Sequence, residues 1–164
     1  MTNSLSTQDI VRALDHKNSG DVSKHWYRLR ETHRVSDMVD QMIEAFPLIK
    51  NAWGRNLILF DLIHFAQKDD RVIDLAITAL HDRAYMPRYQ ACSILAFSLR
   101  KDALPHLNEF RDHKHQKTRV DIRAAIDAIE EQNQNLFVDR DRQGFGWIVG
   151  KEQLLADIER IQNG

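Results

Sequence analysis

The sequence has one cysteine, no long apolar run and no targeting segment. The lone Cys92 excludes a disulfide within the chain and is typical of a reducing compartment. Apolar stretches such as residues 57–60 are far too short to span a bilayer. Residues 1–9 are polar and lack the basic head and apolar run of a secretory signal. We therefore expect a cytoplasmic protein that does not enter a membrane.

Net charge is also nearly absent. The chain has 23 Lys and Arg residues against 24 Asp and Glu residues, a net charge of −1. Such a balance provides no overall positive field that would attract nucleic acid or anionic lipid, so binding of either would require a local patch. The 164 residues are 43% hydrophobic, which is enough for a continuous core in one domain.

What the chain does contain is an internal repeat. Stretches beginning at Arg55, Arg88 and Asp121 lie 33 residues apart and place small or apolar residues in register. Trp26 lies 33 residues before Leu59 and extends the pattern toward the N-terminus. A fixed period of this length indicates stacked helical pairs. We expect one domain, residues 1–164, with about four antiparallel helical pairs at residues 5–34, 36–67, 70–100 and 102–133.

Polar caps and prolines mark the expected helix boundaries. Ser6, Asp21 and Asp70 each precede an apolar stripe at helical spacing and are predicted as N-caps. Pro47 breaks the second pair. Pro87 falls in the first turn of a helix, where a missing N–H is tolerated.

After residue 135 the spacing changes from helical to alternating. Residues 136–138 and 147–149 are apolar and flank a polar, glycine-containing turn, which predicts a short β-hairpin. An amphipathic pattern then predicts a final helix that carries Leu154, Leu155, Ile158 and Ile161. Residues 136–162 would thus cap the last helical pair.

The repeat resembles the HEAT or HEAT-like (armadillo-type) helical repeat family. The resemblance is carried by residues 88–96 and 122–126 and by the capped helix at 70–80. It implies a mainly α fold, a short right-handed α-solenoid with the C-terminal hairpin and helix as its cap. It covers roughly 80% of the chain.

No motif has the spacing of a catalytic or metal site. Residues 139–144 begin like an EF-hand loop, but Gly150 stands where the bidentate glutamate is required. His106, His113 and His115 lack a cysteine or acidic ligand at a zinc-like spacing. A nucleophile motif and a phosphate-binding loop are also missing. We expect no metal, no cofactor and no enzymatic activity.

A row of basic and aromatic residues is the candidate partner-binding site. They occur near the starts of successive second helices, and they are Trp26, Arg28, Trp53, Arg55, Arg88, Tyr89, Arg119 and Arg123. Stacked helices would place them along one strip that can bind phosphate, carboxylate or an acidic protein face. The alternative is that the arginines bridge neighbouring helices through aspartates such as Asp61, Asp70, Asp74 and Asp121.

Two classes of function follow from the resemblance. Small stand-alone HEAT-like proteins resemble adaptors, regulators of enzyme complexes or bacterial immunity proteins, which implies a non-catalytic protein-binding module with another protein as its partner. An immunity protein that opposes a nuclease would present acidic side chains to a basic active site. The candidates for that role are Asp37, Asp40 and Glu44, or Asp69, Asp70 and Asp74.

The alternative is an enzyme that resembles the HEAT-like DNA glycosylases. Such an enzyme uses a basic, aromatic groove and an acidic catalytic side chain. Here Trp26, Trp53 and Tyr89 with Arg55, Arg88 and Arg123 would line the groove, and Asp61 or Asp121 would be the acid. The short chain and its near-zero net charge argue against nucleic acid as the partner.

Overall fold

The computed structural model describes residues 5–144 and 146, and this part of the chain is mainly helical, as expected. Its α-helices are α1 (Thr7–Leu14), α2 (Ser19–Thr32), α3 (Val39–Ala45), α4 (Ala52–Leu62), α5 (Asp70–Ala79), α6 (Tyr85–Ser98), α7 (Leu104–Asn108) and α8 (Gln116–Glu130). Short 3-10 helices join them: η1 (Val35–Asp37), η2 (Phe46–Leu48), η3 (Ile63–Phe65), η4 (Lys101–Ala103) and η5 (Gln134–Phe137). Across the described residues no helix is both long enough and apolar enough to cross a bilayer.

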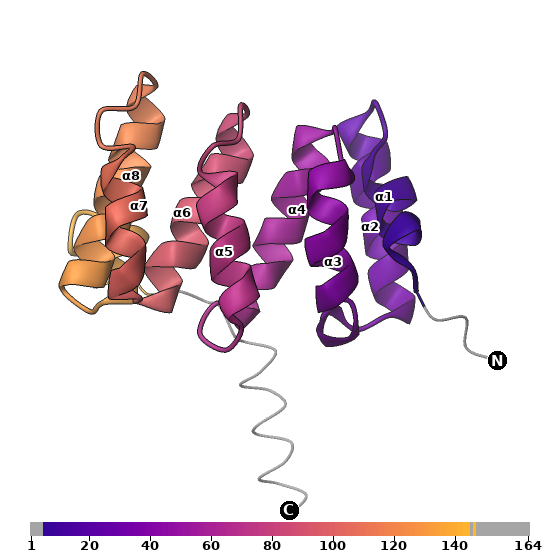
Figure 1. Cartoon of the computed structure of the whole chain (residues 1–164), viewed down its shortest axis with the longest axis horizontal. Coiled ribbons are helices and arrows are strands. Elements are labelled where there is room, and N and C mark those ends of the chain that lie inside the picture. The colour runs from indigo at the N-terminus through magenta and orange to yellow at the C-terminus, as the bar shows by residue number, and fades with distance from the viewer. Residues whose placement is uncertain (1–4, 145, 147–164) are drawn as a thin grey trace, which may run out of the picture.

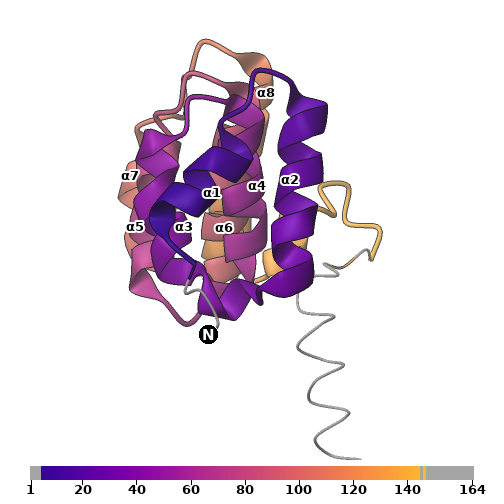
Figure 2. The ribbon, with the colours of Figure 1, turned by 90° about the vertical axis from the view of Figure 1, so that its right-hand side faces the viewer.

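The α-helices lie in two rows (Figures 1 and 2). The even-numbered helices pack side by side in the order α2, α4, α6, α8, and the odd-numbered α1, α3 and α5 form the second row with α7 at its end. Each of the four expected residue ranges contains one odd and one even helix. The helices of a pair contact each other. The first two pairs contact through both rows, and the later pairs contact mainly through the even row.

The repeat spacing is 33 residues except at the last pair. The even helices begin at Ser19, Ala52, Tyr85 and Gln116, so the final interval is 31 residues. The alignment of Asp121 with Arg88 is therefore wrong by two residues, and Arg119 is the residue equivalent to Arg88. The last interval is shorter because α7 has only five residues, whereas α5 has ten.

Side-chain caps fix several helix starts. Ser6 and Asp9 form a reciprocal capping box at α1, which confirms Ser6 as the N-cap. The caps expected for α2 and α5 are wrong by one to three residues, since Asn18 and Asp69 cap these helices. Both residues have extended backbone angles and accept hydrogen bonds from the first-turn N–H groups.

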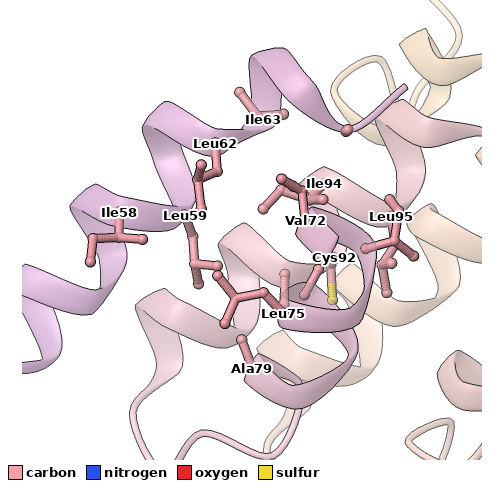
Figure 3. Packing of buried hydrophobic residues seen from close by; sticks show 14 of the residues in the cluster. Ile58, Leu59, Leu62, Ile63, Val72, Leu75, Ala79, Cys92, Ile94 and Leu95 are labelled. Carbon is pink, nitrogen blue, oxygen red and sulfur yellow. The ribbon is translucent and has the colours of Figure 1, made fainter. Parts of the chain in front are cut away.

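A continuous apolar core fills the space between the two rows. Figure 3 shows Leu59 and Leu62 of α4 close to Val72 and Leu75 of α5 and to Cys92 of α6, and all five side chains are buried. Close packing reaches backbone contact at Gly54 of α4, where an added Cβ would lie 2.3 Å from the carbonyl oxygen of Leu14. Only glycine allows α1 and α4 to approach this closely.

The first strand of the expected hairpin is wrong. Residues 136 and 137 belong to the 3-10 helix η5, which begins at the cap Asn133 and packs against α6 and α8. Phe137 is 1% exposed, and its ring lies 5.6 Å from that of Tyr89. A three-residue apolar run has no periodicity that separates a strand from a helical turn, so burial against α6 and α8 decided its form. The second strand, 147–149, and the final helix lie outside the described residues.

Candidate functional site

Three arginines of the predicted row occupy the same position in successive even helices. Arg55, Arg88 and Arg119 are the fourth residues of α4, α6 and α8. The Nη1 atom of each donates to a carbonyl oxygen in the loop that precedes its own helix. The acceptors are Ile49 (3.0 Å) and Lys50 (2.8 Å) for Arg55, Asp82 (2.7 Å) for Arg88, and His113 (2.7 Å) and Lys114 (3.2 Å) for Arg119.

Two of these arginines also join one pair to the next. Arg55 makes a bidentate contact with Asp82, with Nε to Oδ2 at 2.6 Å and Nη2 to Oδ1 at 2.9 Å. The Nε of Arg88 donates to the Oγ1 of Thr118 at 3.1 Å. Burial alone would raise the pKa of Asp82, but the hydrogen bonds from Arg55 and the Ala84 N–H lower it below its ordinary value.

The buried arginines therefore have a structural role. Arg55 is 8% exposed and Arg88 is 4% exposed, so neither presents its guanidinium to a partner. Loop carbonyl groups that are buried away from water require hydrogen-bond donors, and one guanidinium can donate to several of them at once. Both arginines bridge neighbouring pairs, as the alternative expected, but not through the aspartates that it named. Arg55 contacts Asp82, and Arg88 contacts the hydroxyl of Thr118. The 27-residue separation of Arg55 and Asp82 departs from the repeat period and gave no signal.

The two acids proposed for a glycosylase are also buried in internal contacts. Asp61 accepts the indole Nε1 of Trp26 at 2.8 Å and the Nη1 of Arg30 at 2.9 Å. Asp121 accepts the hydroxyl of Tyr85 at 2.9 Å and the Nη2 of Arg140 at 2.8 Å.

Tyr85 shows the effect of this environment on a titratable group. Burial, together with the hydrogen bond to Asp121 and the charge of that carboxylate, raises the pKa of Tyr85 to about 12. The hydroxyl therefore stays protonated and donates to Asp121 at neutral pH. Charged and polar groups between the even helices thus serve to join consecutive pairs.

The remaining predicted residues do not form one strip. Trp26 is completely buried, and the half-buried Trp53 donates its Nε1 to the Oγ of Ser23 at 2.8 Å. Tyr89 is half-buried against Phe137. Arg28 and Arg123 are exposed, but they lie on α2 and α8, the first and last helices of the even row.

Two exposed aromatic residues that the sequence analysis did not select lie on neighbouring even helices. Tyr27 and Phe60 are the ninth residues of α2 and α4, and they are 56% and 53% exposed. α2 and α4 contact each other, and the indole of Trp53 in α4 donates to the hydroxyl of Ser23 in α2. Ser23 lies four residues before Tyr27, and Trp53 lies seven residues before Phe60. Both spacings place two residues on one side of a helix, so this bond joins the sides of the two helices that carry the rings. We call Tyr27, Phe60 and the adjacent half-buried Trp53 the aromatic face. The 33-residue spacing of Tyr27 and Phe60 was the sequence feature that could have predicted this pair.

The same surface is covered farther along the row. The ninth residues of α6 and α8 are Ser93 and Ala124, and both are buried. The helix η5 packs against α6 and α8 there. The even row therefore carries small residues where a segment of the chain covers it and large aromatic residues where the aromatic face is exposed.

The acidic residues proposed for an immunity role lie on the odd row and are partly neutralised. Arg71 contacts Asp40 and Asp69, each at 2.7 Å. Arg100 contacts Asp70 and also Asp102. Of the other candidates, Asp37 accepts the Ser36 hydroxyl and Glu44 accepts the Thr7 hydroxyl, whereas the Asp74 side chain is exposed.

Among the described residues no group of three or more His, Cys, Asp or Glu side chains could hold a metal ion. Comparisons with protein families and with curated proteins find no match for this chain. The surfaces of the helical stack are therefore the basis for a functional assignment.

Proposed function

We propose that the chain is a non-catalytic protein-binding module, built as a short HEAT-like α-solenoid. Two observations support the solenoid: the paired helices stack in two rows at an interval of 33 or 31 residues, and an arginine recurs at the fourth position of three even helices. Such a stack is quasi-one-dimensional and presents long surfaces suited to partners.

The aromatic face is the observation that carries the binding proposal. Folding favours burial of large aromatic side chains, yet Tyr27 and Phe60 are more than half exposed on adjacent helices. The repeat does not require aromatics at this position, since Ser93 and Ala124 occupy it in α6 and α8. Exposed aromatics beside arginine are the residues that most often dominate binding energy at protein interfaces. The exposed Lys24 and Arg28 of α2 supply the cations.

These features favour a partner with an apolar patch bordered by carboxylates. An adaptor and an immunity-type inhibitor would both bind in this way. The version in which the odd-row acids oppose a basic active site has less support, because Arg71 already pairs with Asp40 and Asp69, and Arg100 already pairs with Asp70.

A DNA glycosylase-type enzyme is the alternative and also has less support. Its expected groove residues Arg55 and Arg88 are buried, and its candidate acids Asp61 and Asp121 are held in internal hydrogen bonds. Retention on heparin that falls steeply with salt would favour this alternative.

Affinity capture from the native cell extract tests the proposal. The tagged wild type is compared with a Tyr27→Ser/Phe60→Ser variant and with a Leu48→Ser/Val138→Ser control. The control loses two side chains of similar exposure, 49% and 42%, that lie outside the aromatic face. We expect one stoichiometric protein that is retained by the wild type and the control and lost by the first variant. Equal capture by all three folded proteins, or recovery of nucleic acid only, would contradict the proposal.

A further inference from the structure

The first helical pair leaves a groove open at the end of the stack. Figure 2 looks onto this end, where α1 and α2 lie in front of the other helices. Among the described residues, α3 and α4 cover these two helices on one side only. The resulting groove has a volume of about 730 Å³, and Leu5, Ala13 and Leu29 form the apolar part of its lining.

Most polar side chains of the groove are arginines and histidines. Arg12 and His16 come from α1 and the residues after it, and His25, Arg28 and His33 come from α2 and its C-cap. Asp9 is the one carboxylate among the described lining residues. It already accepts hydrogen bonds from the backbone N–H and the hydroxyl of Ser6 and lies 3.5 Å from Arg12. Arg28 makes no hydrogen bond or ion pair with any described residue.

The imidazoles are organised within the groove. The rings of His16 and His25 stack with centroids 4.4 Å apart and an interplanar angle of 13°. The Nδ1 of His25 donates to the carbonyl oxygen of Asp21 at 2.7 Å. The Nε2 of His16 is buried and has no hydrogen-bond partner among the described residues. Because this nitrogen is closed off from solvent, a ligand in the groove does not reach it, and His16 and His25 contribute to the lining of the groove.

A polar surface that only keeps the end of the stack soluble would explain the residues of the groove less well. Terminal repeats do require a polar outer face, but a surface that serves only for solubility mixes charges of both signs. Here two guanidinium groups and three imidazoles surround one carboxylate that is already hydrogen-bonded. Among the described residues that line the groove, no second carboxylate balances the two guanidinium groups.

We propose that this groove binds the carboxylates of an acidic peptide segment of a partner protein. Arg12 and Arg28 would form charge-assisted hydrogen bonds with the carboxylates. The apolar lining suits the aliphatic part of a glutamate-containing peptide. The described residues that line the groove include no Phe, Tyr or Trp on which a nucleobase could stack, which favours peptide over single-stranded nucleic acid. This proposal rests on the proposed function in one respect, which is that the acidic peptide belongs to a partner protein.

Titration with a hexaglutamate peptide, followed by histidine NMR signals, tests this site directly. We expect the ring signals of His16, His25 and His33 to shift in a saturable manner, while those of His64, His81 and His106 stay in place. An Arg12→Glu/Arg28→Glu variant should bind the peptide about tenfold more weakly or worse, because two attractive charges become repulsive. The matched control is Arg83→Glu/Arg111→Glu, which makes the same charge change at two exposed arginines outside the groove and should bind as the wild type does.

Several results would overturn the proposal. They are absence of shifts at His16, His25 and His33, equal loss of binding in the control variant, or shifts confined to His113 and His115. Tighter binding of an oligothymidylate than of hexaglutamate would assign the groove to nucleic acid instead. Because the probe is a peptide and not the partner, failure here leaves the capture experiment on the aromatic face unaffected.

Discussion

Trp26 in α2 donates its indole Nε1 to the carboxylate of Asp61 in α4, at 2.8 Å and with both side chains buried. The two residues lie 35 positions apart, so the bond joins the first helical pair to the second. Arg30 contacts the same carboxylate at 2.9 Å. A tryptophan that the repeat pattern suggested as a partner contact is thus a link between repeats.

Trp26→Phe should destabilise the protein by about 1–3 kcal/mol, because it removes a donor to a buried charged acceptor while keeping most of the apolar volume. Trp53→Phe is the matched control, since its indole donates to the hydroxyl of Ser23 and is only half-buried. Urea unfolding monitored by circular dichroism measures both changes. A loss for Trp26→Phe no larger than that for Trp53→Phe would show that the bond to Asp61 adds little.

The Arg55–Asp82 contact should make stability depend on acidic pH. The pKa of Asp82 in the folded protein lies below its ordinary value of about 3.9. Its stabilising contribution is therefore complete above about pH 4 and is lost as the pH falls through the folded-state pKa. Denaturation at pH 7 and at pH 3 should show a smaller drop in stability for Asp82→Asn than for the wild type. An equal drop in the two proteins would assign the acid sensitivity to other carboxylates.

Gly54→Ala should be strongly destabilising. The new methyl group would lie 2.3 Å from the Leu14 carbonyl oxygen, so α1 and α4 would have to separate. Overpacking of this kind costs about 1–3 kcal/mol or more. Gly20→Ala in α2 serves as the control, because its nearest neighbour is the side-chain oxygen of Asn18 at 3.0 Å. Thermal unfolding gives the melting temperature of both variants. A melting temperature for Gly54→Ala no lower than that for Gly20→Ala would show that α1 and α4 do not approach this closely.

Cys92 should be chemically inert in the folded protein. Its side chain is completely buried, and this burial raises the pKa of the thiol. Ellman's reagent should react with the native protein at least about a hundredfold more slowly than with the protein in denaturant, since reaction requires opening of the core. Rapid stoichiometric reaction under native conditions would show that α6 is accessible from solvent.

Apolar spacing was sufficient to predict the helices and their pairing along the chain. The apolar stripes of helices such as α5 are set locally by the 3.6-residue period, and the expected ranges each contain two helices. Cap positions were less certain, because adjacent acidic residues such as Asp69 and Asp70 can both cap a helix in principle. The short apolar run at 136–138 could form a strand or a helical turn, and tertiary packing decided between them.

The functional residues were harder to predict for a physical reason. A long basic side chain at the start of a helix can point to solvent or fold back onto a loop, and the sequence pattern is the same in both cases. Arg55 and Arg88 fold back because buried loop carbonyls and Asp82 require donors. Conversely, Phe60 is expected in the core because its side chain is large and apolar. Only the arrangement of α2, α4 and η5 shows that its ring is exposed.

We expect a partner protein to bind the aromatic face. Photocrosslinking tests it most directly, with a benzoylphenylalanine residue placed at position 60 or, as a control, at position 48. Both native side chains are about half exposed, but Leu48 lies in η2, away from Tyr27 and Phe60. In native extract, position 60 should give one discrete protein adduct that position 48 does not give. No adduct at position 60, or the same adduct from both positions, would show that the partner does not bind the aromatic face.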